Sequence, residues 1–161
     1  MRRSLYIETS VFSRLADPGD SFMRKATELF LQSARRTRIL VFAPIVISEI
    51  LQTQPDARRD AILRCMWISG AELLPFREGA ERIAMELLHA GQWSRRRMAD
   101  MHHVAYTILT DADALVTWDI HDLARPKTRT VVHAYARRLG LPVPLIGTPQ
   151  EVAAWLDVRI V

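Results

Sequence analysis

Several features that would narrow the class of this protein are missing from its 161-residue sequence. It has one cysteine, Cys65, which excludes an intramolecular disulfide and favours a reduced, cytoplasmic environment. No apolar run approaches the roughly 20 residues that span a bilayer, and the basic start precedes an apolar stretch too short for a signal peptide. Cys65 and the scattered histidines also lack zinc-ligand spacing. We therefore expect a soluble cytoplasmic protein without a structural zinc site.

Lysine is scarce as well, because the positive charges are nearly all arginine. The net charge is +4, and 49% of the residues are apolar, which is enough for a real core. Arginine binds phosphate through two parallel hydrogen bonds. Charge of this kind supports nucleic-acid binding only weakly, since solvated arginine clusters are common on arginine-rich surfaces.

Short β-branched segments alternate with longer helical patterns, which predicts an α/β fold with a central, mainly parallel sheet flanked by helices. We expect one domain over residues 1–161. Strands are predicted at residues 5–7, 39–42, 71–74, 114–117 and 143–146. Helices are predicted at residues 22–36, 44–51, 56–67, 78–88, 97–109, 130–139 and 149–155. Pro144 makes the last strand an edge strand, and the helical patterns place Trp67 and Trp155 in the core.

Five acidic residues occupy positions where solvated acids are not expected. Glu8 and Asp119 follow predicted strands, and Asp122 lies three residues after Asp119. Glu49 and Asp100 lie early in helices that would flank the same sheet edge, where open α/β sheets bind ligands. Two carboxylates about 4 Å apart repel by roughly 4 kcal/mol at an effective dielectric near 20. No lysine or histidine is obviously placed to neutralise them, so Mg²⁺ or Mn²⁺ is the expected counterion.

Bound cations of this kind activate water and shield the charge that develops on a phosphodiester, and two of them about 4 Å apart would steady both reacting oxygens. Three hydroxyls next to the acids, those of Thr9, Ser10 and Thr117, are expected to orient water or to donate to phosphate. The arginine run Arg95, Arg96 and Arg97 directly precedes Asp100. We expect it to guide RNA or to meet an acidic partner.

Other polar and aromatic residues near the acids are given lesser roles. One of His102 and His103 could face the cleft and touch phosphate, although positions on the helix surface or partly buried are favoured for both. His121 is expected to serve only the structure of its loop. Trp93 and Trp118 are the tryptophans expected to contact RNA or a partner protein.

At these residues the sequence resembles a PIN domain, and specifically the VapC-type toxin nucleases of bacterial toxin–antitoxin pairs. The resemblance spans nearly the whole chain. Segments 6–11, 48–50, 100–105 and 117–123 resemble the family's four acidic motifs, and Thr148-Pro149 before a helix resembles its ending. Their order and spacing together are more specific than any one of them.

The resemblance implies a three-layer α/β/α PIN-like fold, metal-dependent endoribonuclease activity, a homodimer, and inhibition by a small antitoxin protein. It assigns catalytic and metal-binding roles to Glu8, Glu49, Asp100 and Asp119, with Asp122 as a further metal ligand. The family's first acid is usually aspartate, whereas Glu8 stands here. Its longer side chain moves the carboxylate by about one bond length, so it is expected to bind the ion through water or to shift the site.

The leading hypothesis is thus a Mg²⁺/Mn²⁺-dependent endoribonuclease that hydrolyses RNA phosphodiester bonds as the toxin of a VapBC-type pair. A second hypothesis is a catalytically weak PIN-fold module that binds RNA or protein. A third is a phosphoryl-transfer enzyme or receiver-like domain, in which Asp119 would have to be the nucleophile because Glu8 suits that role poorly.

Overall fold

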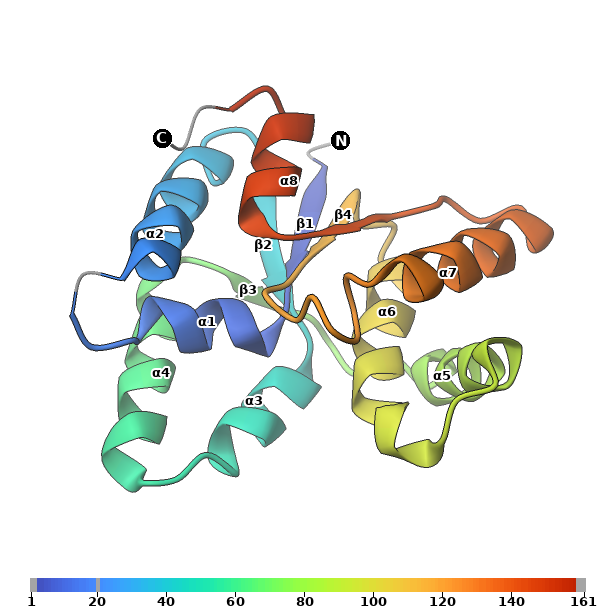
Figure 1. Cartoon of the computed structure of the whole chain (residues 1–161), viewed down its shortest axis with the longest axis horizontal. Helices are drawn as coiled ribbons and strands as arrows, with labels where there is room; N and C mark the ends of the chain where they lie inside the picture. Colours follow the sequence, from blue (N-terminus) through green and yellow to red (C-terminus); the bar gives the residue numbers. More distant parts are fainter. Residues whose placement is uncertain (1–2, 20, 159–161) are drawn as a thin grey trace.

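A single sheet of five parallel strands lies at the centre of the computed structural model, which describes residues 3–19 and 21–158 (Figure 1). The strands are β1 (Ser4–Ile7), β2 (Ile39–Phe42), β3 (Glu72–Leu73), β4 (Ala114–Val116) and β5 (Leu145–Gly147). Each falls on a predicted strand, with ends shifted by at most two residues. Pro144 directly precedes β5, which is an edge strand as predicted.

The order of the strands, β3-β2-β1-β4-β5, reverses at β1. The chain runs outward from β1 to β2 and β3, then returns to place β4 on the other side of β1. Tyr6 of β1 lies between Val41 of β2 and Leu115 of β4. In an open parallel sheet, such a reversal leaves a crevice at the carboxyl ends of the two adjacent strands, here β1 and β4.

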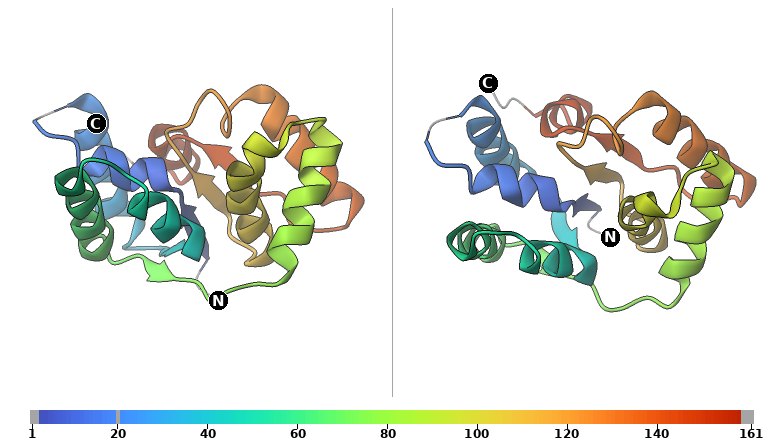
Figure 2. Two further views of the ribbon diagram at one scale, coloured as in Figure 1. Left: turned by 90° about the horizontal axis from the view of Figure 1, so that it is seen from below. Right: turned by 60° about the horizontal axis from the view of Figure 1, so that its bottom comes forward.

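Helices cover both faces of the sheet, on opposite sides in Figure 2. One face packs against α5 (Gly79–Gly91), α6 (Met98–Leu109) and α7 (Pro126–Arg138). The other packs against α1 (Thr9–Leu15), α2 (Phe22–Ala34), α3 (Pro44–Leu51), α4 (Asp56–Ile68) and α8 (Pro149–Trp155). Because strand side chains alternate between faces, Tyr6 joins the first core while Leu5 and Ile7 join the second. The predicted three-layer α/β/α architecture is confirmed.

Some helical predictions were wrong in their details. Trp67 and Trp155 are 63% and 48% exposed rather than buried. Trp67 follows Met66, which is fully buried, and successive residues of a helix do not share a face. Trp155 ends α8, after the inward-facing Val152. The α7 helix also begins four residues earlier than predicted, with Pro126 in its first turn, where the missing N–H costs nothing.

The described residues include no helix with both the length and the apolar character required to cross a membrane.

Candidate metal centre

The predicted acidic residues meet at the carboxyl ends of β1 and β4. Glu8 follows β1 directly and is the N-cap of α1, while Asp119 lies three residues after the end of β4. Asp100 comes from the first turn of α6, and Glu49 comes from α3. They form two groups rather than one, an aspartate group of Asp100, Asp119 and Asp122, and a glutamate group of Glu8 and Glu49 with His103.

The aspartate group has the geometry of a cation site. Asp100, Asp119 and Asp122 each offer a carboxylate oxygen, and these oxygens lie within 4.8 Å of one another. The loop after β4 holds two of them, because Asp119 Oδ1 accepts the backbone N–H groups of His121 at 3.2 Å and Asp122 at 2.9 Å. The side chain of Asp122 is 50% exposed, so the group faces solvent on one side.

Arg97 provides positive charge to this group from within the protein. Its Nε lies 3.2 Å from Asp100 Oδ2 and 3.6 Å from Asp122 Oδ1, and its side chain is only 11% exposed. A terminal nitrogen donates to the Asp122 carbonyl oxygen at 2.7 Å, and the guanidinium stacks 4.4 Å from the centre of the Trp93 ring. Of the predicted arginine run, only Arg95 and Arg96 are therefore exposed to solvent.

One guanidinium does not balance three carboxylates. Burial raises the pKa of Asp100, and although Arg97 lowers it, the charges of Asp119 and Asp122 raise it further. The net increase comes mainly from burial, and three carboxylates beside one guanidinium leave a formal excess of negative charge. An all-oxygen donor set with excess negative charge matches the preference of Mg²⁺ and Mn²⁺, so these three residues fit the predicted ion.

The glutamate group differs because its partners are side-chain hydroxyls and an imidazole rather than backbone N–H groups and a guanidinium. Glu8 Oε2 accepts the hydroxyls of Ser10 and Thr117, the latter at 2.7 Å. Glu49 Oε2 accepts the Thr9 hydroxyl and lies 3.0 Å from Nε2 of His103. Burial raises the pKa of Glu49, but the hydrogen bonds and the charge of His103 give a net decrease, so this carboxylate is ionised.

His103 is the main site residue whose role the sequence analysis set aside. It is 1% exposed, contrary to the expectation of a surface or partly buried histidine, and Tyr6 Oη lies 2.9 Å from its Nδ1. Its position, three residues after Asp100 on α6, was the available signal, since residues at i and i+3 share a helix face. The expectation that no histidine would lie beside the acids was therefore wrong.

Hydroxyl groups connect the two acidic groups. Thr117 Oγ1 donates to Glu8 and accepts the backbone N–H of Asp119 at 2.9 Å. Ser10 Oγ donates to Glu8 and accepts the backbone N–H of Trp118 at 2.8 Å. These bonds fix the end of β4 against the start of α1. The three hydroxyl residues selected from the sequence all contact the glutamate group.

The two tryptophans expected to contact RNA or a partner have contacts within the protein. The indole Nε1 of Trp118 donates to Thr27 Oγ1 at 2.9 Å. Trp93 lies under the cations of Arg97 and Lys127, the latter 5.6 Å from the ring centre. Both rings are partly buried, and the Trp93 ring supports the arginine that contacts the aspartate group.

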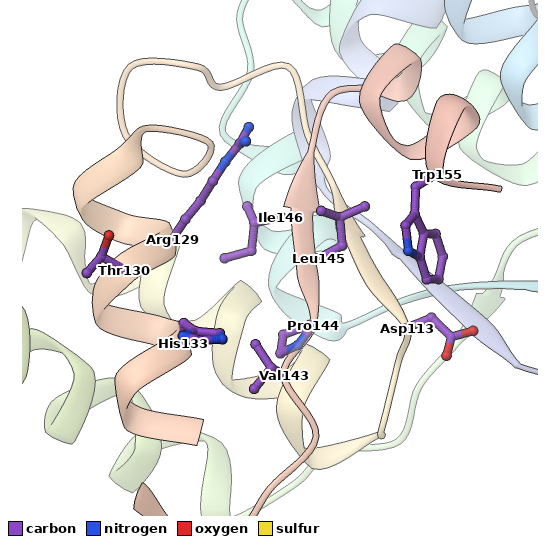
Figure 3. A pocket seen from close by; sticks show the side chains of 9 residues that line it. All are labelled: Asp113, Arg129, Thr130, His133, Val143, Pro144, Leu145, Ile146 and Trp155. Atoms are coloured by element: carbon purple, nitrogen blue, oxygen red, sulfur yellow. The ribbon is translucent and has the colours of Figure 1, made fainter. Parts of the chain in front are cut away.

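A separate cavity of about 510 Å³ lies at the outer edge of the sheet (Figure 3). Its lining comprises Asp113, Arg129, Thr130, His133, Val143, Pro144, Leu145, Ile146 and Trp155. None of the predicted site residues is among them. Arg129 is paired with Glu151 at 2.9 Å, and Asp113 with Arg38 at 3.5 Å. The acidic groups at β1 and β4 therefore remain the candidate site.

Comparison with known proteins supports the fold. No family model and no curated protein sequence matches this chain. Among solved structures, a chain of the VapBC2 complex from Rickettsia felis, solved bound to a DNA fragment from its promoter, superposes with a TM-score of 0.56. The match covers 89% of this chain and 97% of that chain at 14% sequence identity. This chain thus has a PIN-like α/β/α fold.

Proposed function

We propose that this protein is a divalent-cation-dependent endoribonuclease that hydrolyses RNA phosphodiester bonds, and that it is the toxin of a VapBC-type toxin–antitoxin pair. The observation that supports the nuclease is the aspartate group, whose three carboxylates converge at the strand reversal with one arginine. The fold shared with a chain of the VapBC2 complex supports the toxin assignment. The proposed protein is a single PIN-like domain, cytoplasmic and homodimeric, with a small antitoxin as partner.

The aspartate group would hold Mg²⁺ or Mn²⁺, and the bound ion supplies Lewis-acid stabilisation of the charge that develops on the phosphodiester. The chain's own residues then orient the substrate. Arg95 and Arg96 are exposed in the turn directly before α6, which carries Asp100, and we propose that they bind backbone phosphates without selecting a base sequence. Thr117 holds both Glu8 and the backbone of Asp119, so the site is organised before RNA binds.

Cleavage of a labelled single-stranded RNA with Mn²⁺ tests the nuclease. We expect Asp119→Asn to reduce cleavage to background, because it removes a carboxylate from the aspartate group. Asp60→Asn is the matched control, since it removes the same charge from a 52% exposed side chain on α4. Cleavage that persists in EDTA, or in Asp119→Asn, would refute the proposal.

The toxin assignment needs a separate test in cells. Expression of the wild-type chain is expected to slow growth, and co-expression of a small neighbouring gene is expected to restore it. The Asp119→Asn variant should not slow growth at equal protein levels. Slow growth caused equally by this variant would mean that the effect does not come from the aspartate group. Light scattering of the purified chain tests the homodimer.

One observation favours the second candidate, a catalytically weak module that binds RNA or protein. Glu8 is bonded to Ser10 and Thr117 and lies outside the aspartate group. Glu8→Asp separates the candidates. The shorter side chain withdraws the carboxylate from the hydroxyls of Ser10 and Thr117, and it restores the aspartate that is usual in the resembled family. A silent wild-type protein that gains cleavage activity as Glu8→Asp would favour the binding module.

A further inference from the structure

The two glutamates accept hydrogen bonds from side-chain hydroxyls and lie beside a buried histidine, whereas Asp119 accepts them from backbone N–H groups and Asp100 from Arg97. Four groups point at the glutamate oxygens, the hydroxyls of Thr9, Ser10 and Thr117 and the Nε2 of His103. Exposure overlaps between the two groups at Glu49 and Asp100, whose side chains are 29% and 24% exposed. Glu8 is 7% exposed, and the side chain of Asp122 is 50% exposed.

His103 lies between the two glutamates, with its Nε2 3.0 Å from Glu49 Oε2 and 4.0 Å from Glu8 Oε1. A carboxylate only accepts hydrogen bonds, so Nε2 must carry a hydrogen in this position. The ring cannot turn away easily, because it is 1% exposed and its Nδ1 is hydrogen-bonded to Tyr6. The positive end of an N–H dipole is thus fixed toward both carboxylates.

We propose that the chain binds one divalent cation, at Asp100, Asp119 and Asp122, and that His103 takes the place of a second cation between Glu8 and Glu49. A cation that bridged the two glutamates would approach their oxygens to about 2.0–2.2 Å. There it would meet the Nε2–H of His103 head-on, which repels positive charge. His103 is therefore a positioning residue. It holds Glu49 in place, and His103 itself does not contact the bound ion.

This inference rests on the proposed metal-dependent function and specifies how many ions that function uses. Mn²⁺ binding measured by isothermal titration calorimetry and electron paramagnetic resonance, without RNA, tests it independently of cleavage. The wild-type chain should bind one Mn²⁺. Asp119→Asn should weaken binding by about 100-fold or more, because a ligand is lost. Glu49→Gln should keep one ion and weaken it by at most about fivefold, since that charge acts only at a distance.

His103→Ala is the decisive variant, because it removes the N–H and leaves room beside two carboxylates. We expect it to bind two Mn²⁺ per chain, whereas His133→Ala, an exposed histidine on α7, should still bind one. Circular dichroism checks that each variant is folded, and if His103→Ala is not folded, Glu49→Gln still tests the inference. Two ions in the wild type, one ion in folded His103→Ala, or a loss of binding in Glu49→Gln as large as in Asp119→Asn would overturn it. No saturable Mn²⁺ binding at all would instead refute the metal-dependent function.

Discussion

Replacing Arg97 with methionine should destabilise the metal-free protein, because Arg97 supplies positive charge to three aspartates that repel one another. Its guanidinium is within 3.6 Å of two of these carboxylates and donates to the Asp122 carbonyl oxygen as well. Methionine retains the apolar stem, so packing against Trp93 is partly preserved. The substitution therefore tests the charge and the hydrogen bonds rather than the volume of the side chain.

The expected magnitude follows from how deeply the partners are buried. Removing one partner of a buried ion pair costs about 3–5 kcal/mol. The side chains of Asp100 and Asp122 are 24% and 50% exposed, so water screens part of the unpaired charge. We therefore expect a loss of about 2–3 kcal/mol in the free energy of unfolding. With a urea dependence of about 2 kcal/mol per molar, the unfolding midpoint falls by about 1–1.5 M.

Urea unfolding in EDTA is the assay, and Arg96→Met is the matched control. Arg96 lies in the same turn but is exposed, so its replacement should change stability by no more than about 0.5 kcal/mol. A free Mn²⁺ concentration about 100 times the dissociation constant should add about 2.7 kcal/mol to any variant that binds it. If Arg97→Met and Arg96→Met unfold at the same urea concentration in EDTA, the charge argument for the aspartate group fails.

Three further substitutions probe the surroundings of the site. Tyr6→Phe leaves Nδ1 of His103 without its partner in a buried position, so thermal unfolding should show a loss of about 1–2 kcal/mol. Gly91→Ala would place a Cβ 2.3 Å from the Trp93 ring. The displaced ring should cost about 1–3 kcal/mol and alter tryptophan fluorescence. The raised pKa of Asp100, from burial and the neighbouring aspartates, stabilises the fold at low pH, and this contribution is lost as pH rises through the folded-state pKa. Asp100→Asn should therefore remove that pH dependence in EDTA and raise the urea midpoint at neutral pH, while abolishing RNA cleavage.

The sheet was the most predictable part of the molecule, because a strand buried on both faces is a short apolar run that ends abruptly at a polar residue. Glu8 follows Leu5-Tyr6-Ile7 in this way, and Asp119 follows β4 at the same sheet edge. Because β1 and β4 are adjacent, the residues directly after them lie at one edge of the sheet, and Thr117 contacts Glu8 there. Asp119, two residues further along the loop, joins Asp100 and Asp122 instead, so the strand ends alone did not predict the division into two groups.

The partners of the acids were less predictable, because they depend on how helices rotate against the sheet. The pattern of α6 shows which residues share a face of the helix. It does not show whether His103 is buried, because that depends on the packing of Tyr6 in β1 against it. Arg97 belongs to a run of three arginines with identical local signals. Only the turn before α6 decides that Arg97 points inward, while Arg95 and Arg96 face solvent.

The crossing of β1 and α6 accounts for the gradient of burial through the site. The strand's two-residue period places Tyr6 and Glu8 on the face toward α6, and the helix places His103 and Asp100 one turn apart on the face toward β1. Tyr6 and His103 are at most 1% exposed and Glu8 is 7% exposed, while the side chain of Asp100 is 24% exposed. Polar groups at the buried end must satisfy one another, since water cannot reach them. Carboxylates at the open end can exchange bound water for an incoming cation. The packing of one strand against one helix thus places a fixed hydrogen-bonded network at the buried end and a cation site at the exposed end.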